Sequence, residues 1–150
     1  MRSLALALLL LSLPARADDQ PAARCTLRVV HALPQEGGVD DKLQPLRARL
    51  LRAPFREWKT FRLLSAEERE LQPTGAVEYP LPEGRKAHLV YSEHAMEKGK
   101  HVVRGTLGLD GVRSSARTMF SLDEGGVLLV AGQRHAGGIL IYALSCRTGK

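Results

Sequence analysis

The sequence GVLLVAGQRHAGGILIYALSC, residues 126–146, contains two strongly apolar segments joined by a short glycine-containing connection. The segments are Val127–Gly132 and Ile139–Ser145. β-Branched and aromatic residues bounded by glycines predict strands, and near-continuous apolar runs predict strands that are buried on both faces. We therefore expect two strands, each buried on both faces, at the end of the chain.

Both cysteines of the chain lie at the ends of apolar segments. Cys146 follows the last segment, and Cys25 opens the first one, Cys25–Leu33. Two cysteines in an oxidising compartment predict one disulfide bond. This bond organises the predicted fold, because it closes the first strand onto the last.

Antiparallel pairing of these two strands would align apolar residues on one face. It sets Leu27 opposite Leu144 and Val29 opposite Tyr142. If the strands are not direct neighbours, the bond instead ties the tail across an edge or between layers, and this register does not hold.

The N-terminal residues predict export. Residues 1–17 combine an early arginine, an apolar core at Leu4–Leu13 and a small-x-small end, which is the pattern of a signal peptide cut before Asp18. The apolar run is too short to span a bilayer, and no later run is longer. An arginine precedes Cys25, which does not fit a lipoprotein box. We expect a periplasmic or secreted protein without a transmembrane segment.

After a short tether at residues 18–24, residues 25–150 predict a single β-rich domain. The net charge of +6 favours anionic surfaces and does not indicate nucleic acid, which an exported protein seldom meets. We expect no nucleic-acid partner.

One helix is predicted at Asp41–Arg52. Asp41 and Gln44 fit a capping box, Pro45 falls in the first turn, and Pro54 prevents continuation. The apolar residues at helical spacing are Leu43, Leu46 and Leu50.

The remaining chain predicts strands. Besides the three apolar segments above, these are Trp58–Leu64, Gly75–Leu81, Lys86–Met96, Lys100–Leu109 and Val112–Leu122. Pro80 makes Gly75–Leu81 an edge strand, and Ser65–Glu70 is a polar connection. Turns at Lys98-Gly99 and Asp110-Gly111 predict hairpins. The fold class is mainly β (α+β): an antiparallel two-layer, β-sandwich-like domain of seven to eight strands, with the N-terminal helix on one edge or face.

Three segments together resemble small exported domains of bacterial cell-envelope proteins that have no assigned activity. They are Phe-x-x-Trp-x-x-Phe-x-Leu-Leu at Phe55–Leu64, Leu-Pro-x-Gly at Leu81–Gly84, and the apolar segments of residues 127–143. These are core and turn residues. The resemblance therefore implies the fold and an envelope location, and it implies no catalytic residue.

The sequence contains no hydrolase signature and no phosphate-binding glycine loop. Ser114, Ser115 and Ser121 lie in a predicted strand without a histidine at an informative distance, and caps, loops and turns explain the clustered carboxylates. We expect a protein without enzymatic activity. An unrecognised hydrolase is a third hypothesis for the function, because catalytic groups can assemble without a local motif.

A hairpin at Lys98-Gly99 would place His94, Met96 and His101 on one face. Two imidazoles and a thioether suit a soft metal such as copper. The alternative is that these residues are simply solvated at a hairpin tip, and a turn that differs by one residue breaks the arrangement.

The predicted helix and the residues after it carry an excess of positive charge. The cations are Arg47, Arg49, Arg52, Arg56 and Lys59, flanked by Lys42 and Arg62. Such a surface could hold an acidic protein, an anionic envelope polymer or lipid headgroups, or it could be only a solvated face. The sequence thus favours a non-catalytic exported binding or structural domain of the cell envelope, such as an adaptor in a larger assembly. The alternative is a periplasmic copper-binding protein.

Overall fold

The computed structural model describes residues 20–111 and 116–148. The predicted signal peptide and the pair Ser114 and Ser115 lie outside the described residues. Within the described residues, every helix is too short to cross a lipid bilayer.

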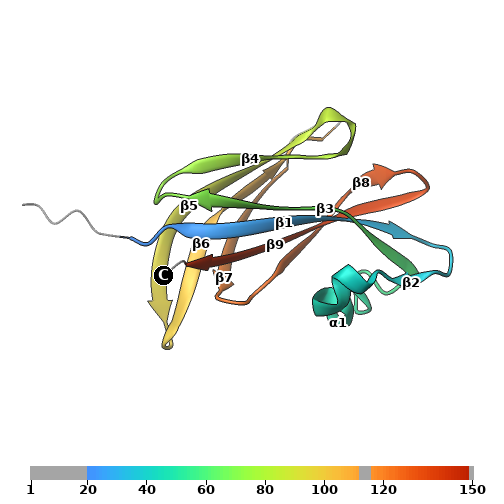
Figure 1. Ribbon diagram of the computed structural model, residues 1–150, viewed down its shortest axis with the longest axis horizontal. Coiled ribbons are helices and arrows are strands. Elements are labelled where there is room, and N and C mark those ends of the chain that lie inside the picture. Colours follow the sequence, from blue (N-terminus) through green and yellow to red (C-terminus); the bar gives the residue numbers. More distant parts are fainter. Residues whose placement is uncertain (1–19, 112–115, 149–150) are drawn as a thin grey trace, which may run out of the picture.

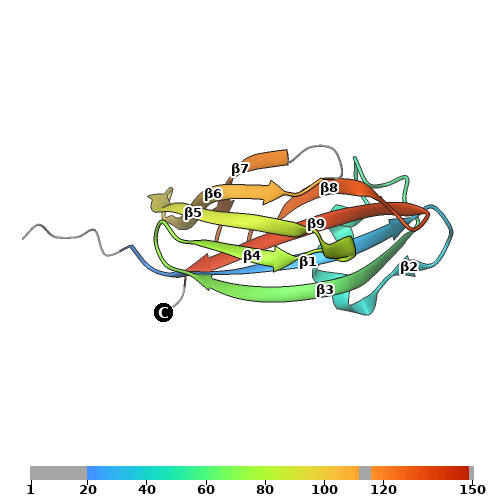
Figure 2. The same ribbon diagram turned by 90° about the horizontal axis from the view of Figure 1, so that it is seen from above.

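The described chain forms two β-sheets that lie one over the other along the long axis of the molecule (Figures 1 and 2). Sheet A has the order β2-β3-β1-β9-β8, and sheet B has the order β4-β5-β6-β7. The strands of sheet A are β1 (Ala23–Leu33), β2 (Gly38–Val39), β3 (Thr60–Leu71), β8 (Leu128–His135) and β9 (Gly138–Thr148). The strands of sheet B are β4 (Ala76–Pro80), β5 (Lys86–Glu97), β6 (Lys100–Leu109) and β7 (Ala116–Asp123).

The predicted fold class is confirmed in its coarse form. The fold is mainly β, the two sheets are antiparallel apart from the short parallel pair β2–β3, and one short helix lies near the N-terminal end. The predicted strand count of seven to eight is wrong, because the described residues form nine strands. The additional strand is β2, which has two residues and therefore too short a sequence pattern to be recognised.

β1 and β9 are antiparallel neighbours in sheet A, with Cys25 opposite Cys146. The two sulfur atoms lie 2.09 Å apart, at disulfide distance. The predicted register is confirmed by the pairs Leu27 with Leu144 and Val29 with Tyr142. The strand begins at Ala23, inside the segment predicted as a tether.

Two apolar clusters hold the fold together. The larger one fills the space between the sheets and includes the largest fully buried side chains of sheet B, Tyr79, Tyr91, Leu89 and Leu107. The smaller one lies on the outer face of sheet A, where the helical segment covers it (Figure 1). It consists of Val30, Ala32, Leu43, Leu46, Leu50, Phe55, Phe61, Ile141 and Ala143. Both faces of β1 and β9 are therefore buried, as the sequence Ile139–Ser145 predicts for β9. The same prediction is wrong for Val127–Gly132, because β8 lies at the edge of sheet A and its side chains are only partly buried.

The predicted helix at Asp41–Arg52 is shorter and less regular than expected. It consists of the 3₁₀ segment η1 (Asp41–Leu46) and the single α-helical turn α1 (Arg47–Leu50). Pro45 lies inside η1, where it removes an amide donor and disfavours the α conformation of the preceding residue. These effects explain the tighter 3₁₀ geometry.

The helix cap also differs from the expected one. Asp40, and not Asp41, accepts a hydrogen bond from the backbone N–H of Lys42 at 3.0 Å. Its second carboxylate oxygen accepts from the N–H of Leu63 at 3.2 Å. These backbone hydrogen bonds lower the pKa of Asp40. One carboxylate thus caps η1 and fixes it to β3.

The prediction that Ser65–Glu70 forms a polar connection is wrong, because these residues continue β3. They pair with β1 from Arg24 to Val29, and a register shift follows between Val29 and Val30. Charged residues of this segment form ion pairs on the surface, such as Arg24 with Glu70 at 3.4 Å. A polar segment is a strand here because β1 supplies a hydrogen-bonding partner, which local sequence does not reveal.

Candidate functional site

The helical segment and the turn after it place the predicted cations on one side of sheet A. Leu43, Leu46, Leu50 and Phe55 point into the smaller apolar cluster. The cations between and after them are exposed, and these are Arg47, Arg49, Arg52, Arg56 and Lys59. We call these five residues the basic face.

Within one short segment, the basic face gathers five cations that form no ion pair among the described residues. Cations on β1, β3, β6 and β9 form ion pairs, such as Arg69 with Glu67 and Arg147 with Glu68. Among the described residues, no ion pair includes a member of the basic face. Glu57 is the one acidic residue between Arg47 and Lys59, and it forms no ion pair with these cations, so an excess of positive charge remains on this surface.

A hollow of about 300 Å³ opens within the basic face. It is lined by Arg49, Arg52, Ala53, Pro54, Phe55, Val127 and Leu129. The Nη1 of Arg49 donates a hydrogen bond of 2.8 Å to the carbonyl oxygen of Val127, which ties the hollow to the start of β8. The hollow thus combines an apolar floor with two guanidinium groups. It can accept an apolar side chain that lies close to a negative charge.

The β5–β6 hairpin brings the two predicted histidine ligands together. The Nε2 of His94 lies 2.8 Å from the Nδ1 of His101, and the ring centroids are 5.0 Å apart. Met96 is directly opposite His101, so it lies on the same face of the hairpin as the two histidines. Met96 is 58% exposed. The backbone N–H of His94 donates to the side-chain oxygen of Gln20 at 3.1 Å, which anchors this arm of the hairpin.

The turn residues explain why the histidines meet. Lys98 and Gly99 both have positive φ, at 49° and 76°, which is the backbone conformation of a two-residue hairpin turn. Among the described residues, no group of three or more His, Cys, Asp or Glu side chains is arranged for a metal. A metal at this hairpin would therefore depend on two imidazoles and the thioether of Met96.

A third group of polar residues was not predicted from the sequence. It lies where the turn between β4 and β5 meets the β8–β9 hairpin. Glu83 forms an ion pair with Arg85 at 2.9 Å and lies 3.6 Å from the Nδ1 of His135. The backbone carbonyl of His135 is bonded to the Nε2 of His31 at 2.9 Å. The group lies beside a hollow of about 590 Å³ that is also lined by Trp58.

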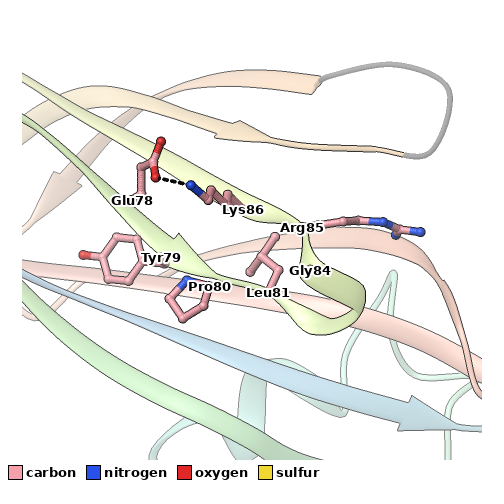
Figure 3. Close-up of a pocket in the computed structure, with 7 residues that line it drawn as sticks. All are labelled: Glu78, Tyr79, Pro80, Leu81, Gly84, Arg85 and Lys86. Atoms are coloured by element: carbon pink, nitrogen blue, oxygen red, sulfur yellow. Dashed lines mark hydrogen bonds and ion pairs between the residues drawn. The ribbon is translucent and has the colours of Figure 1, made fainter.

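The turn between β4 and β5 also borders a smaller hollow of about 280 Å³ (Figure 3). Figure 3 shows Lys86 directed toward Glu78, at a distance of 2.8 Å, whereas Arg85 points away from that pair. The hydrogen bond to Lys86 lowers the pKa of Glu78. Because Lys86 pairs with Glu78 and Arg85 with Glu83, this hollow offers weaker attraction to a charged ligand than the basic face does.

Comparison with known protein families, with characterised proteins and with solved structures finds no match for this chain.

Proposed function

We propose that this chain is a non-catalytic binding domain of the bacterial cell envelope, which holds an acidic polypeptide partner on its basic face. It would be exported through a signal peptide at residues 1–17, and it would act as an adaptor within a larger envelope assembly. The close pair of Cys25 and Cys146 supports an oxidising location, because disulfide bonds persist in such compartments.

The single observation that carries this proposal is the composition of the basic face. Two of its five exposed cations, Arg49 and Arg52, line a hollow whose other walls are apolar residues, and no acidic side chain among the described residues forms an ion pair with any of the five. A polypeptide that carries acidic residues beside an apolar side chain would satisfy both features. A flat solvated face needs no hollow with an apolar floor, which favours the binding interpretation.

A peptide titration tests the proposal. The probe is a fluorescent peptide of alternating Glu and Leu, and its anisotropy is followed at low and at physiological salt. We expect binding that weakens with salt, because exposed charges are screened within about 8 Å at physiological ionic strength. The double variant Arg52→Glu with Arg56→Glu should bind at least tenfold more weakly. Arg49 is not changed, because its hydrogen bond to Val127 supports the local fold.

A matched control separates the basic face from net charge. Lys100→Glu with Arg117→Glu alters two exposed cations elsewhere and changes the net charge by the same amount. This control should bind the peptide as the wild type does. Equal affinities of all three proteins would contradict the proposal. Tighter binding to phosphatidylglycerol vesicles than to the peptide would assign the basic face to lipid instead.

A second candidate function is binding of Cu(I), and the observation that favours it is the 2.8 Å contact between His94 and His101. Two nitrogen ligands of one ion lie about 3.3 Å apart when the metal–nitrogen bonds are about 2.0 Å long and the angle is tetrahedral. A separation of the rings by about half an ångström would therefore suffice, and Met96 would supply a soft third ligand.

Competition with a Cu(I) chelator tests this candidate. His101→Ala should weaken Cu(I) binding at least tenfold. His88→Ala is the control, because His88 also lies on β5 but contacts Glu78 and Asp110. A wild-type affinity no higher than that of a free peptide would exclude the candidate.

A further inference from the structure

The edge strands of the two sheets are protected to different degrees. β2 has only two residues, and β4 contains Pro80, which cannot donate a backbone hydrogen bond. β7 has exposed charges near its two ends, Arg117 and Asp123, and an uncharged stretch between them in which Met119 is 87% exposed. β8 also has an uncharged, proline-free stretch, Leu128–Ala131, and it differs from β7 because the side chains of this stretch pack against both apolar clusters. An uncharged, proline-free apolar edge strand is a template for pairing with another strand.

The side chains of β8 are incompletely buried on both faces of the sheet. Leu128 and Val130 pack against the apolar cluster between the sheets, whereas Leu129 packs against the cluster under the helical segment. All three are partly exposed, although their partners on β9 are fully buried. Burial decreases from β9 to β8 because, among the described residues, no strand pairs with β8 on its outer side. One added strand would extend both clusters.

The hydrogen-bonding edge is regular over this short stretch and ends at a bulge. The register with β9 is continuous from Leu128 to Ala131 and then shifts before Arg134. Such bulges terminate strand pairing in natural sheets. An added strand would therefore pair with about four residues, which limits the length of the recognised segment.

Charges at the two ends of this stretch decide between possible occupants. Arg49 and Arg52 lie at its beginning, and the exposed Arg134 lies at its end. In an antiparallel pair of two copies of this chain, Arg134 of one copy would face the Arg49–Arg52 pair of the other. Like charges in such positions are destabilising. The charges instead match an extended segment with acidic residues at both ends.

We infer that β8 binds an extended segment of a partner polypeptide by strand addition. The segment carries alternating apolar residues, flanked by acidic residues that face Arg52 and Arg134. Backbone hydrogen bonds to β8 supply affinity, and the alternating side chains supply specificity. A side chain on the same face as Leu129 enters the hollow of the basic face. The inference rests on the proposed function only for the acidic character of the partner.

The experiment uses peptides of alternating Val and Thr between terminal Glu residues. Two further peptides carry backbone N-methyl groups on alternate residues, in opposite phases. In strand addition the backbone N–H groups of every second peptide residue point toward β8. Only one of the two N-methylation patterns therefore removes the N–H groups that would bond to β8. We therefore expect one N-methylated peptide to bind at least tenfold more weakly, and the other to bind like the unmodified peptide. Equal binding by both phases, or no binding of the unmodified peptide, would overturn the inference.

Protein variants test the edge and the occupant. Arg134→Glu on β8 should weaken binding, whereas Arg117→Glu on β7, also exposed, should not. Equal effects of these two variants on peptide binding would overturn the assignment to β8. In sedimentation experiments the protein alone should not form a dimer that depends on Arg134. A dimer that Arg134→Glu weakens or strengthens would instead assign β8 to a second copy of this chain.

The failure of this inference differs from a failure of the proposed function. If Arg52→Glu with Arg56→Glu abolishes binding but both N-methylated phases bind equally, the basic face binds acidic partners without strand addition. If one phase binds more weakly and Arg134→Glu weakens binding, but Arg52→Glu with Arg56→Glu has no effect, strand addition to β8 holds and the basic face does not hold the partner.

Discussion

The hydroxyl group of Tyr79 on β4 donates a hydrogen bond of 2.7 Å to the carbonyl oxygen of Cys25 on β1. Both residues are 1% exposed, so this polar bond crosses the core between the two sheets. Burial raises the pKa of the Tyr79 phenol, which keeps the group protonated as a donor. The bond joins sheet B to sheet A beside the Cys25–Cys146 pair.

Removal of this hydroxyl group should destabilise the fold. Tyr79→Phe leaves a buried carbonyl without its side-chain donor, and the expected loss in the free energy of unfolding is about 1–3 kcal/mol. Tyr91→Phe is a matched control, because its hydroxyl bonds to the carbonyl of Pro21 near the N-terminal end, in a part-buried position. Urea denaturation should show the larger loss for Tyr79→Phe. Similar losses of stability in the two variants would contradict the role of the Tyr79 hydrogen bond in joining the two sheets.

The Cys25–Cys146 bond closes nearly the whole described chain, with a sequence separation of 121 residues. In the chain-entropy model, closure of so long a loop stabilises the fold by about 4–5 kcal/mol. Reduction, or replacement of Cys25 and Cys146 by alanine, should therefore lower the melting temperature markedly. Thiol titration of the unreduced protein checks the bond itself, and two titratable thiols would refute it.

Two glycines of β6 offer a test of packing within one strand. A Cβ atom at Gly105 would overlap the carbonyl oxygen of Val90 and lie 2.8 Å from Cζ of Phe120. At Gly108 the nearest atom would be 3.6 Å away, which is ordinary contact. Gly105→Ala should lower the free energy of unfolding by about 1–3 kcal/mol through overpacking, and Gly108→Ala should change it little. Thermal unfolding of both variants compares them, and an equal effect would contradict the close approach of β5, β6 and β7 at Gly105.

Asp40 gives the fold a dependence on pH in acid. Its pKa is lowered in the folded protein by the hydrogen bonds from the N–H groups of Lys42 and Leu63. Its contribution is therefore complete above its usual pKa of about 3.9, and it disappears as the pH falls through the lowered value. Asp40→Asn should be less stable than the wild type at neutral pH, and the difference should shrink in acid. Urea midpoints over that range measure it; a constant difference would contradict the assigned role.

The closure of the fold was predictable because its signals are local. Alternation and burial in Cys25–Leu33 and Ile139–Ser145, together with two cysteines, leave one favourable register for the pair. The turn residues Lys98 and Gly99 likewise determine that His94 and His101 meet. In both cases the signals lie within short stretches of sequence, although β1 and β9 are themselves far apart in the chain.

Features that depend on tertiary pairing could not be read from the sequence. The polar half of β3 is a strand only because β1 lies beside it. Glu83 and His135 are far apart in the chain and meet only after the sheets pack. The basic face was predicted as a set of charges, but its hollow needed β8 as one wall. Local sequence signals carry no information on such contacts.

Hydrogen–deuterium exchange with and without the acidic peptide tests the central claim most directly. If the domain holds its partner at the basic face and at the edge of β8, binding should slow exchange in Arg49–Phe55 and in Leu128–Ala131. Exchange in β7 and in the His94–His101 hairpin should stay unchanged. Protection confined to that hairpin or to the hollow beside Trp58, or no protection at a saturating peptide concentration, would contradict the account.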